Sequence, residues 1–188
     1  ADYITVNISS PNTANLRNLH DEKKFEELIN TIEEEKIKLK SKTPIVVKIS
    51  PDILDNQINL ISEILLKYKV SAIIVSNSTE TSRENLQNIL KHQKGGLSGK
   101  PLEQKSNKLI AKFYNLLKGK IKIIGVGGVD SGKSAYEKFL AGADYIQLYT
   151  GMVFQGPNIV GNIKKELKEL LINEGVNNFK EIIGKKDN

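Results

Sequence analysis

Residues 3–13 read Tyr-Ile-Thr-Val-Asn-Ile-Ser-Ser-Pro-Asn-Thr, an apolar β-branched run that passes directly into a polar segment. β-branched residues favour strands, whereas Ser, Pro and Asn favour turns, so a strand over residues 3–8 is expected to end in a loop. A dinucleotide-binding fold would have a glycine-rich turn after its first strand. No glycine follows this strand, which counts against that fold.

The alternation of strand and helix patterns continues along the chain. Further short apolar runs occupy residues 44–49, 71–76, 121–126 and 145–149. The segments between them repeat apolar residues with a helical period, as in Phe25, Leu28 and Ile32. Strands that are apolar on both faces and separated by helices belong to parallel sheets. Of the two parallel architectures, an open doubly wound sheet and a (β/α)8 barrel, the first turn favours the barrel.

A polar cluster follows each predicted strand, at residues 9–13, 50–52, 77–79, 127–128 and 150–151. In a barrel, the carboxyl ends of the strands lie on one face, where the βα loops build the active site. Five loops are therefore expected to face one pocket.

The expected strands fill only part of a barrel. A complete barrel has eight strands and typically about 250 residues, whereas about five strands are expected in these 188 residues. Residues 1–188 are expected to form one partial domain of α/β class. Because an incomplete barrel leaves strand edges unpaired, we expect the missing strands to come from the same gene product or from another chain.

Composition excludes several classes of protein. With 39% hydrophobic and 27% charged residues, the chain suits a globular fold, and no apolar run approaches the roughly 20 residues of a membrane-spanning helix. Cysteine is absent, and His20 and His92 lie in charged surroundings, so no metal site is expected. The net charge of +6 comes from lysines interleaved with glutamates on helical segments, which favours solvated helix faces over nucleic-acid binding.

Lys48 lies inside the apolar run Val46-Val47-Lys48-Ile49. It could be an exposed strand residue. Because a buried charge needs a partner, we expect instead that its ammonium points into the barrel mouth and meets an anionic or electron-rich ligand.

Two glycine-rich segments, residues 95–99 and 125–128, suit phosphate binding, because glycine lets backbone N–H groups approach phosphate oxygens. Ser131 and Gly132 are expected to open a helix whose N-terminus favours an anion. Both segments could also be ordinary tight turns, but their occurrence together with Tyr149-Thr150-Gly151 favours a phosphate site.

Asn77 lies in a polar group with Ser76 and Ser78, and it would face Asn7 and Asn12 across the barrel mouth. Carboxamides both donate and accept hydrogen bonds, so these facing asparagines suit a small heterocycle with amide and carboxylate groups. Asn77 could instead cap the segment that follows it, and residues 9–13 could be a simple polar turn.

Six segments, taken in order, resemble dihydroorotate dehydrogenase: 7–13 (NISSPNT), 47–52 (VKISPD), 76–79 (SNST), 95–102 (GGLSGKPL), 123–128 (IIGVGG) and 147–150 (QLYT). Serine rather than cysteine at position 10 resembles class 2, the membrane-associated and quinone-using branch. The resemblance implies the C-terminal part of a TIM (β/α)8 barrel, without the N-terminal strands that supply further contacts.

The resemblance also implies an FMN enzyme that oxidises dihydroorotate to orotate in pyrimidine (UMP) biosynthesis, with quinone as acceptor. Ser10 would be the base, and Lys48 would stabilise negative charge on the reduced cofactor. The implied cofactor contacts are Asn7, Lys48, Ser76, Gly99, Gly128, Tyr149 and Thr150. The implied substrate contacts are Asn7, Ser10, Asn12, Asn77 and Ser78.

By the same resemblance, the enzyme would lie at the mitochondrial inner membrane, or at the cytoplasmic membrane in bacteria, and would associate through an N-terminal segment. The chain by itself is expected to have little or no activity. Two other functions stay open on the residues alone. One is a flavin-free, phosphate-binding barrel isomerase or lyase, and the other is a non-catalytic anion-binding fragment.

Overall fold

The computed structural model describes residues 1–10, 21–81 and 83–185. Its centre is one sheet of five strands in chain order: β1 (Ile4–Asn7), β2 (Ile45–Lys48), β3 (Ala72–Val75), β4 (Lys122–Val126) and β5 (Tyr145–Gln147). Every neighbouring pair is parallel. The prediction of about five parallel strands is confirmed, with each strand one or two residues shorter than its apolar run.

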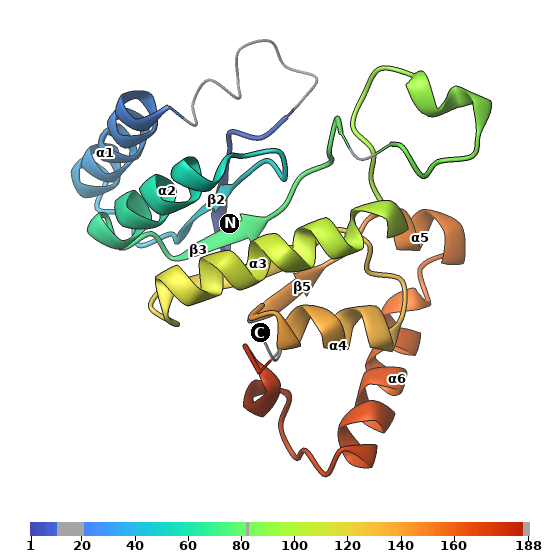
Figure 1. Ribbon diagram of the computed structural model, residues 1–188. Helices are drawn as coiled ribbons and strands as arrows, with labels where there is room; N and C mark the ends of the chain where they lie inside the picture. The colour runs from blue at the N-terminus through green and yellow to red at the C-terminus, as the bar shows by residue number, and fades with distance from the viewer. Residues whose placement is uncertain (11–20, 82, 186–188) are drawn as a thin grey trace.

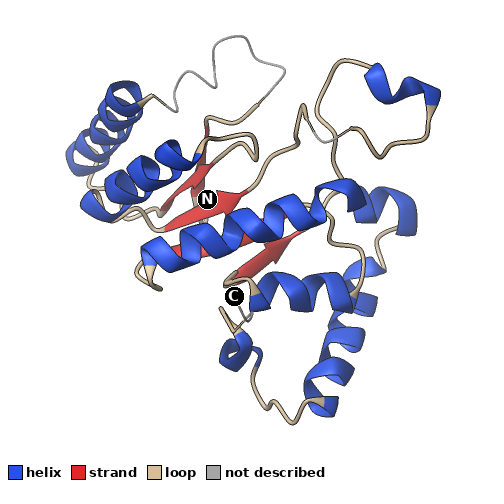
Figure 2. Ribbon diagram, viewed as in Figure 1, coloured by secondary structure: helices blue, strands red, loops and turns tan. Residues whose placement is uncertain are grey.

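The helices that connect successive strands cover one face of the sheet, and two further helices follow the last strand. They are α1 (Glu22–Lys38), α2 (Asp55–Lys67), α3 (Glu103–Leu117), α4 (Gly132–Leu140), α5 (Thr150–Gln155) and α6 (Ile159–Asn173), with short 3-10 turns η2 (Ile89–His92), η3 (Lys100–Leu102) and η4 (Phe179–Ile182). Figure 1 shows α1 to α4 side by side in chain order. Figure 2 shows the strands behind this row of helices.

The main core lies between the sheet and the helices. Val47, Ile73 and Ile123 point toward this layer from three strands, and Phe25 and Phe113 meet them from α1 and α3. None of these five side chains is more than 1% exposed. The helical spacing of apolar residues thus turns one stripe of each helix onto the sheet, as the sequence predicts.

The opposite face of the sheet has its own, smaller apolar cluster. Val46, Ile74 and Ile124 alternate along their strands with the residues of the main core and pack against one another. Lys48 is two residues after Val46, so it belongs to the same face. This is the face that would look into a barrel.

The sheet curls toward that inner face. The side-chain Nε2 of Gln147, on β5, donates a hydrogen bond of 3.3 Å to the hydroxyl of Tyr3, which directly precedes β1. Four strand spacings of a flat sheet would separate β1 from β5 by about 19 Å. Among the described strands, β1 and β5 each pair on one side only. The sheet therefore has the curvature of a barrel wall and two unpaired edges.

The parallel register places the carboxyl ends of the strands on one rim. Asn7, the last residue of β1, pairs with Lys48, the last residue of β2. At the other side of the sheet, Val126 pairs with Gln147, and these residues end β4 and β5. Polar residues that follow the strands are therefore brought to one end of the molecule.

In the part of the chain that the structure describes, no helix is both long and apolar enough to span a membrane.

We predict that Phe113→Ala lowers the free energy of unfolding by about 3–5 kcal/mol, because it empties a fully buried ring site between helix and sheet. Leu116→Ala, in the same helix but 38% exposed, is the matched control and should have a clearly smaller effect. Urea unfolding of both variants measures the difference, and equal losses would contradict the assigned core.

Candidate functional site

A pocket of about 700 Å³ opens at the rim formed by the strand ends. Eight residues that the sequence predicts to bind ligand line it: Lys48, Ser76, Asn77, Ser78, Gly99, Gly128, Tyr149 and Thr150. They come from the end of β2, from the loops after β3, β4 and β5, and from the segment before α3. The loops after β1 and β2 contribute no described residue to its wall, so the expected five-loop pocket is formed by fewer loops.

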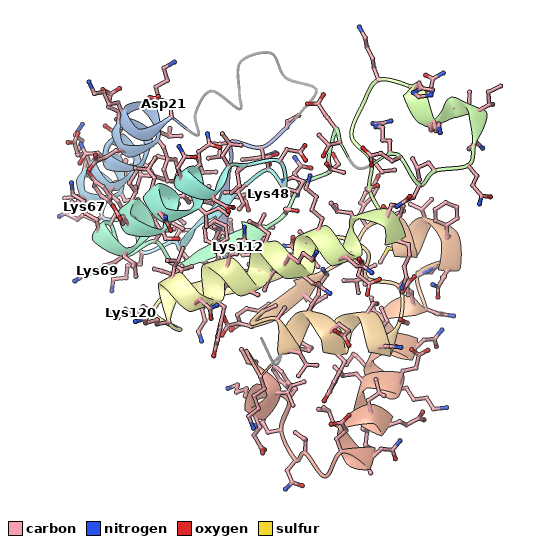
Figure 3. All side chains as sticks on the ribbon, viewed as in Figure 1. Asp21, Lys48, Lys67, Lys69, Lys112 and Lys120 are labelled. Carbon is pink, nitrogen blue, oxygen red and sulfur yellow. The ribbon has the colours of Figure 1, made fainter. Side chains whose placement is uncertain are left out.

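Lys48 is half-buried at the pocket wall, which differs from the alternative of an exposed strand lysine. Figure 3 shows it apart from Lys67, Lys69 and Lys120, which lie at the far ends of the helices. Burial lowers the pKa of the Lys48 amine. Within the described residues, no carboxylate forms an ion pair with it, so an anionic ligand in the pocket would supply a missing partner.

A chain of hydrogen bonds joins the ends of β1 and β3. Ser9 Oγ donates to Asn7 Oδ1 at 2.5 Å, and Asn77 Nδ2 donates to Ser9 Oγ at 3.0 Å. Asn77 Oδ1 in turn accepts the backbone N–H of Ser78 at 2.8 Å. The carboxamides of Asn7 and Asn77 are thus brought together through Ser9, a residue for which the sequence predicts no individual role.

Ser10 follows the buried Ser9 and is half-buried. Neither Ser10 nor Asn7 lines the 700 Å³ pocket, although both lie at the same rim. The backbone N–H of Ile8 donates to the carbonyl of Lys48 at 3.2 Å, which keeps the end of β1 beside β2 up to the residues just before Ser10. Asn12 and His20 lie outside the described residues.

Two glycines of the pocket wall lie where a side chain could not. Gly99 and Gly128 have φ angles of 78° and 77°, which glycine adopts readily. A Cβ at Gly128 would be 2.4 Å from the Cβ of Glu103, and one at Gly99 would be 2.9 Å from Cγ2 of Thr150. Ser98 Oγ and Thr150 Oγ1 lie 2.8 Å apart across the same corner. Backbone groups and hydroxyls therefore gather there, as phosphate binding requires.

The helix expected to favour an anion at its N-terminus holds a carboxylate of the chain itself there. Ser131 is the N-cap of α4, as predicted, and its hydroxyl accepts the N–H of Ser134 at 3.2 Å. The N–H of Gly132 donates to the Glu166 carboxylate at 2.6 Å. A carboxylate from α6 therefore already occupies the positive end of this helix, and the preference for an anion there is met within the chain.

Asp52 ties three segments together beside the pocket. Its carboxylate accepts hydrogen bonds from Lys105 Nζ at 2.5 Å, from the backbone N–H of Glu80 at 2.9 Å and from the hydroxyl of Thr79. Burial alone would raise the pKa of the Asp52 carboxyl, but these hydrogen bonds outweigh it and hold the pKa below its usual range. Thr79, predicted to belong to the polar group at the pocket, is fully buried and turned to Asp52 instead.

A second set of contacts closes the loop between β3 and α3. Thr79 and Leu97 exchange two backbone hydrogen bonds of 3.0 and 2.7 Å. Within the loop, the guanidinium of Arg83 donates to the carbonyls of Lys91 and Gln93 at 3.0 and 2.9 Å, and also to that of Gly95. These hydrogen bonds fix the loop, and Ser98 and Gly99 at its end line the pocket.

His92 is exposed in η2 and does not line the pocket. In residues 1–10, 21–81 and 83–185, no group of three or more metal-ligating side chains could hold a metal ion.

We predict that Asp52→Asn lowers the free energy of unfolding by about 3 kcal/mol at neutral pH, because it leaves Lys105 without its charge partner. The wild-type advantage should shrink as the pH falls through the lowered pKa of Asp52, since the protonated carboxyl no longer attracts the lysine. Asp55→Asn is the control, because the Asp55–Lys112 pair is 82% and 51% exposed. An Asp52→Asn loss that is unchanged between neutral and acidic pH would contradict the charge-pair role.

The family model described as dihydroorotate dehydrogenase matches residues 1–171. The mitochondrial dihydroorotate dehydrogenase (quinone) of Mus musculus is 41% identical over 186 residues, which cover 98% of this chain and 47% of the mouse protein. The dihydroorotate dehydrogenase (quinone) of Bartonella tribocorum is 43% identical over 96% of this chain and 51% of its own length.

Among solved structures, the dihydroorotate dehydrogenase of Eimeria tenella in complex with ferulenol superposes with a TM-score of 0.94 at 33% identity. The match covers 98% of this chain and 54% of that one. The chain thus spans about half the length of the relatives it matches. A family model that covers most of the chain, together with this fold, shows that the chain belongs to the dihydroorotate dehydrogenase family.

Proposed function

We propose that the chain is the C-terminal part of an FMN-dependent enzyme that oxidises dihydroorotate to orotate, with quinone as electron acceptor. One observation carries the proposal: a single rim pocket gathers a half-buried lysine, a carboxamide, hydroxyls and two close-packed glycine turns. Family membership supports the same reaction, since the relatives are named dihydroorotate dehydrogenase (quinone).

The pocket fits a cofactor of the size of FMN. Its volume of about 700 Å³ falls within the range of about 300–1,000 Å³ of small-molecule sites. Phosphate would be held at one end by backbone N–H groups of Gly99 and Gly128 and by the hydroxyl of Thr150, with Tyr149 beside it. Ser76 and Lys48 would hold the ring system at the other end. The turn at Gly128 requires glycine, because a side chain there would collide with Glu103 at the start of α3.

Lys48 would hold a positive charge against the cofactor. Its lowered pKa shows that burial disfavours the charged amine in the absence of a partner. A ligand that gains negative charge would restore the favourable electrostatics, and its charged form would be stabilised in return. When bound, FMN supplies an acceptor for the hydride from C6 of dihydroorotate and passes electrons on to quinone.

The substrate would lie near the Asn7–Ser9–Asn77 chain, where carboxamides can donate to and accept from its amide and carboxylate groups. Ser78 and Asn12 would complete these contacts. Ser10 would remove the proton from C5. A free hydroxyl is a weak base, so it would act through solvent exclusion or a chain of water molecules.

We also propose that further residues, from the same protein or another chain, complete the barrel. β1 and β5 each pair on one side only among the described strands, and relatives are about twice as long. The chain alone would then have little or no activity. The mouse relative is named as mitochondrial, and we place the complete enzyme at the mitochondrial inner membrane, with the bacterial cytoplasmic membrane as the alternative.

We predict that Ser10→Ala in the full-length protein slows flavin reduction by dihydroorotate by about 10²–10⁴-fold, because the base is removed. Ser10→Cys should restore part of the rate as the pH rises, since the pKa of a cysteine thiol in water is about 8.5 and the thiolate can act as a base. Stopped-flow absorbance at the flavin band measures both rates. An unchanged rate in Ser10→Ala would remove Ser10 from the role of base, and a colourless protein that FMN cannot reconstitute would refute the flavin function itself.

We predict that Lys48→Met makes the two-electron midpoint potential of the bound flavin more negative by about 30 mV or more, equivalent to about 1.4 kcal/mol. The reason is the loss of a positive charge that stabilises the electron-rich form. Lys122→Met is the matched control, because Lys122 begins β4 at the opposite end of the sheet and pairs with Asp144. Equal potentials in Lys48→Met and wild type would contradict the electrostatic role.

A further inference from the structure

Lys138 is a lysine in the protein interior. It lies in the last turn of α4, and it is 0% exposed, like Phe25 and Phe113 of the main core. Lysine is almost never fully buried unless its amine has partners. Its aliphatic stem packs against β4, since a Cβ at Gly125 would lie 3.2 Å from the Lys138 Cδ.

The amine of Lys138 is bound by α3. Nζ donates to Asn107 Oδ1 at 2.8 Å and to Ser106 Oγ at 3.1 Å. Ser106 is itself fully buried, and its hydroxyl donates to the carbonyl of Val126 at 2.7 Å. A hydroxyl has a single hydrogen, so the hydrogen bond that Ser106 accepts from Lys138 directs its own hydrogen to the backbone.

The Val126 carbonyl, at the pocket wall, accepts a second hydrogen bond besides that of Ser106. It comes from the backbone N–H of Ser76 at 3.1 Å, so the carbonyl joins the ends of β3 and β4. Gly127 and Gly128 follow it directly, and Val126, Ser76 and both glycines line the 700 Å³ pocket. The orientation of the Val126 peptide therefore determines where the glycine turn begins.

Packing alone does not account for an amine at this position. Burial lowers the pKa of Lys138 to about 7, against the attraction of Glu103, so the charged form is disfavoured in the folded protein. An aliphatic side chain of similar length would fill the same space without that penalty. What the amine adds is the pair of directed hydrogen bonds to α3.

We propose that Lys138 is a positioning residue for the phosphate end of the cofactor site, acting through Ser106 on the Val126 carbonyl and the Gly127–Gly128 turn. The inference rests on the proposed binding of FMN and adds to it a buried residue that touches neither cofactor nor substrate. The expected effect is specific, because Lys138 supports the Gly127–Gly128 turn, which would hold the phosphate. Binding of the phosphate should therefore depend on Lys138, whereas binding of the flavin ring should not.

The test compares FMN with riboflavin, which has the same ring system without the phosphate, in the full-length protein. Dissociation constants are measured by flavin fluorescence for wild type, Lys138→Met and the control Lys133→Met, an exposed lysine of the same helix. We expect wild type and Lys133→Met to prefer FMN equally. In Lys138→Met, FMN affinity should fall at least tenfold while riboflavin affinity changes less than twofold.

Ser106→Ala tests the same turn independently, because it removes the hydroxyl that donates to the Val126 carbonyl. It should reduce the preference for FMN in the same way, and adding Lys138→Met to it should cause little further loss, because both changes remove one relay. Urea unfolding checks that each variant is folded. If Lys138→Met does not fold, the outcome for Ser106→Ala decides.

Two results would overturn the inference: an unchanged preference for FMN in both variants, or equal losses of FMN and riboflavin affinity, which would indicate general damage to the site. If the wild-type protein binds neither flavin, the proposed function fails first and this inference with it. If wild type prefers FMN and both variants keep that preference, only the role of Lys138 is refuted.

Discussion

Parallel pairing of the strands in chain order is the constraint on which the rest of the structure depends. Because each strand pairs with its sequence neighbour in the same direction, every carboxyl end reaches one rim. Helices cover the outer face and bury its apolar residues, the inner face holds a smaller apolar cluster, and the polar side chains gather at the rim. Lys48 illustrates this: its position two residues after Val46 directs a charge to the inner face just where the strand ends.

Two ionisable residues, the half-buried Asp52 and the fully buried Lys138, support the rim beside the pocket. Asp52 joins the loops after β2 and β3 to Lys105 of α3. Lys138 joins α4 to α3 and, through Ser106, to the end of β4. Both use α3 as the common element, and its first turn packs directly against Gly128. The position of α3 is therefore coupled to both halves of the site, the polar loops on one side and the glycine turn on the other.

The sequence was sufficient to predict the strands, the helix periods and eight of the residues that line the pocket, because strand ends and glycine turns have local patterns. It did not identify interactions between residues far apart in the chain. Glu166 occupies the N-terminus of α4 from 34 positions away, and no pattern near Gly132 indicates it. Ser9 resembled any polar loop residue, yet it links Asn7 to Asn77. Lys138 has the spacing of an ordinary helix lysine, and the packing of α4 against α3 and β4 buries it.

A crystal structure of the full-length protein with FMN and orotate would show whether one rim binds both ligands. We expect a closed barrel in which the phosphate accepts hydrogen bonds from the backbone at Gly99 and Gly128, and in which orotate lies beside Asn77 with Lys48 at the flavin. A flavin bound away from this rim, or strand ends that do not meet around one ligand, would contradict this expectation.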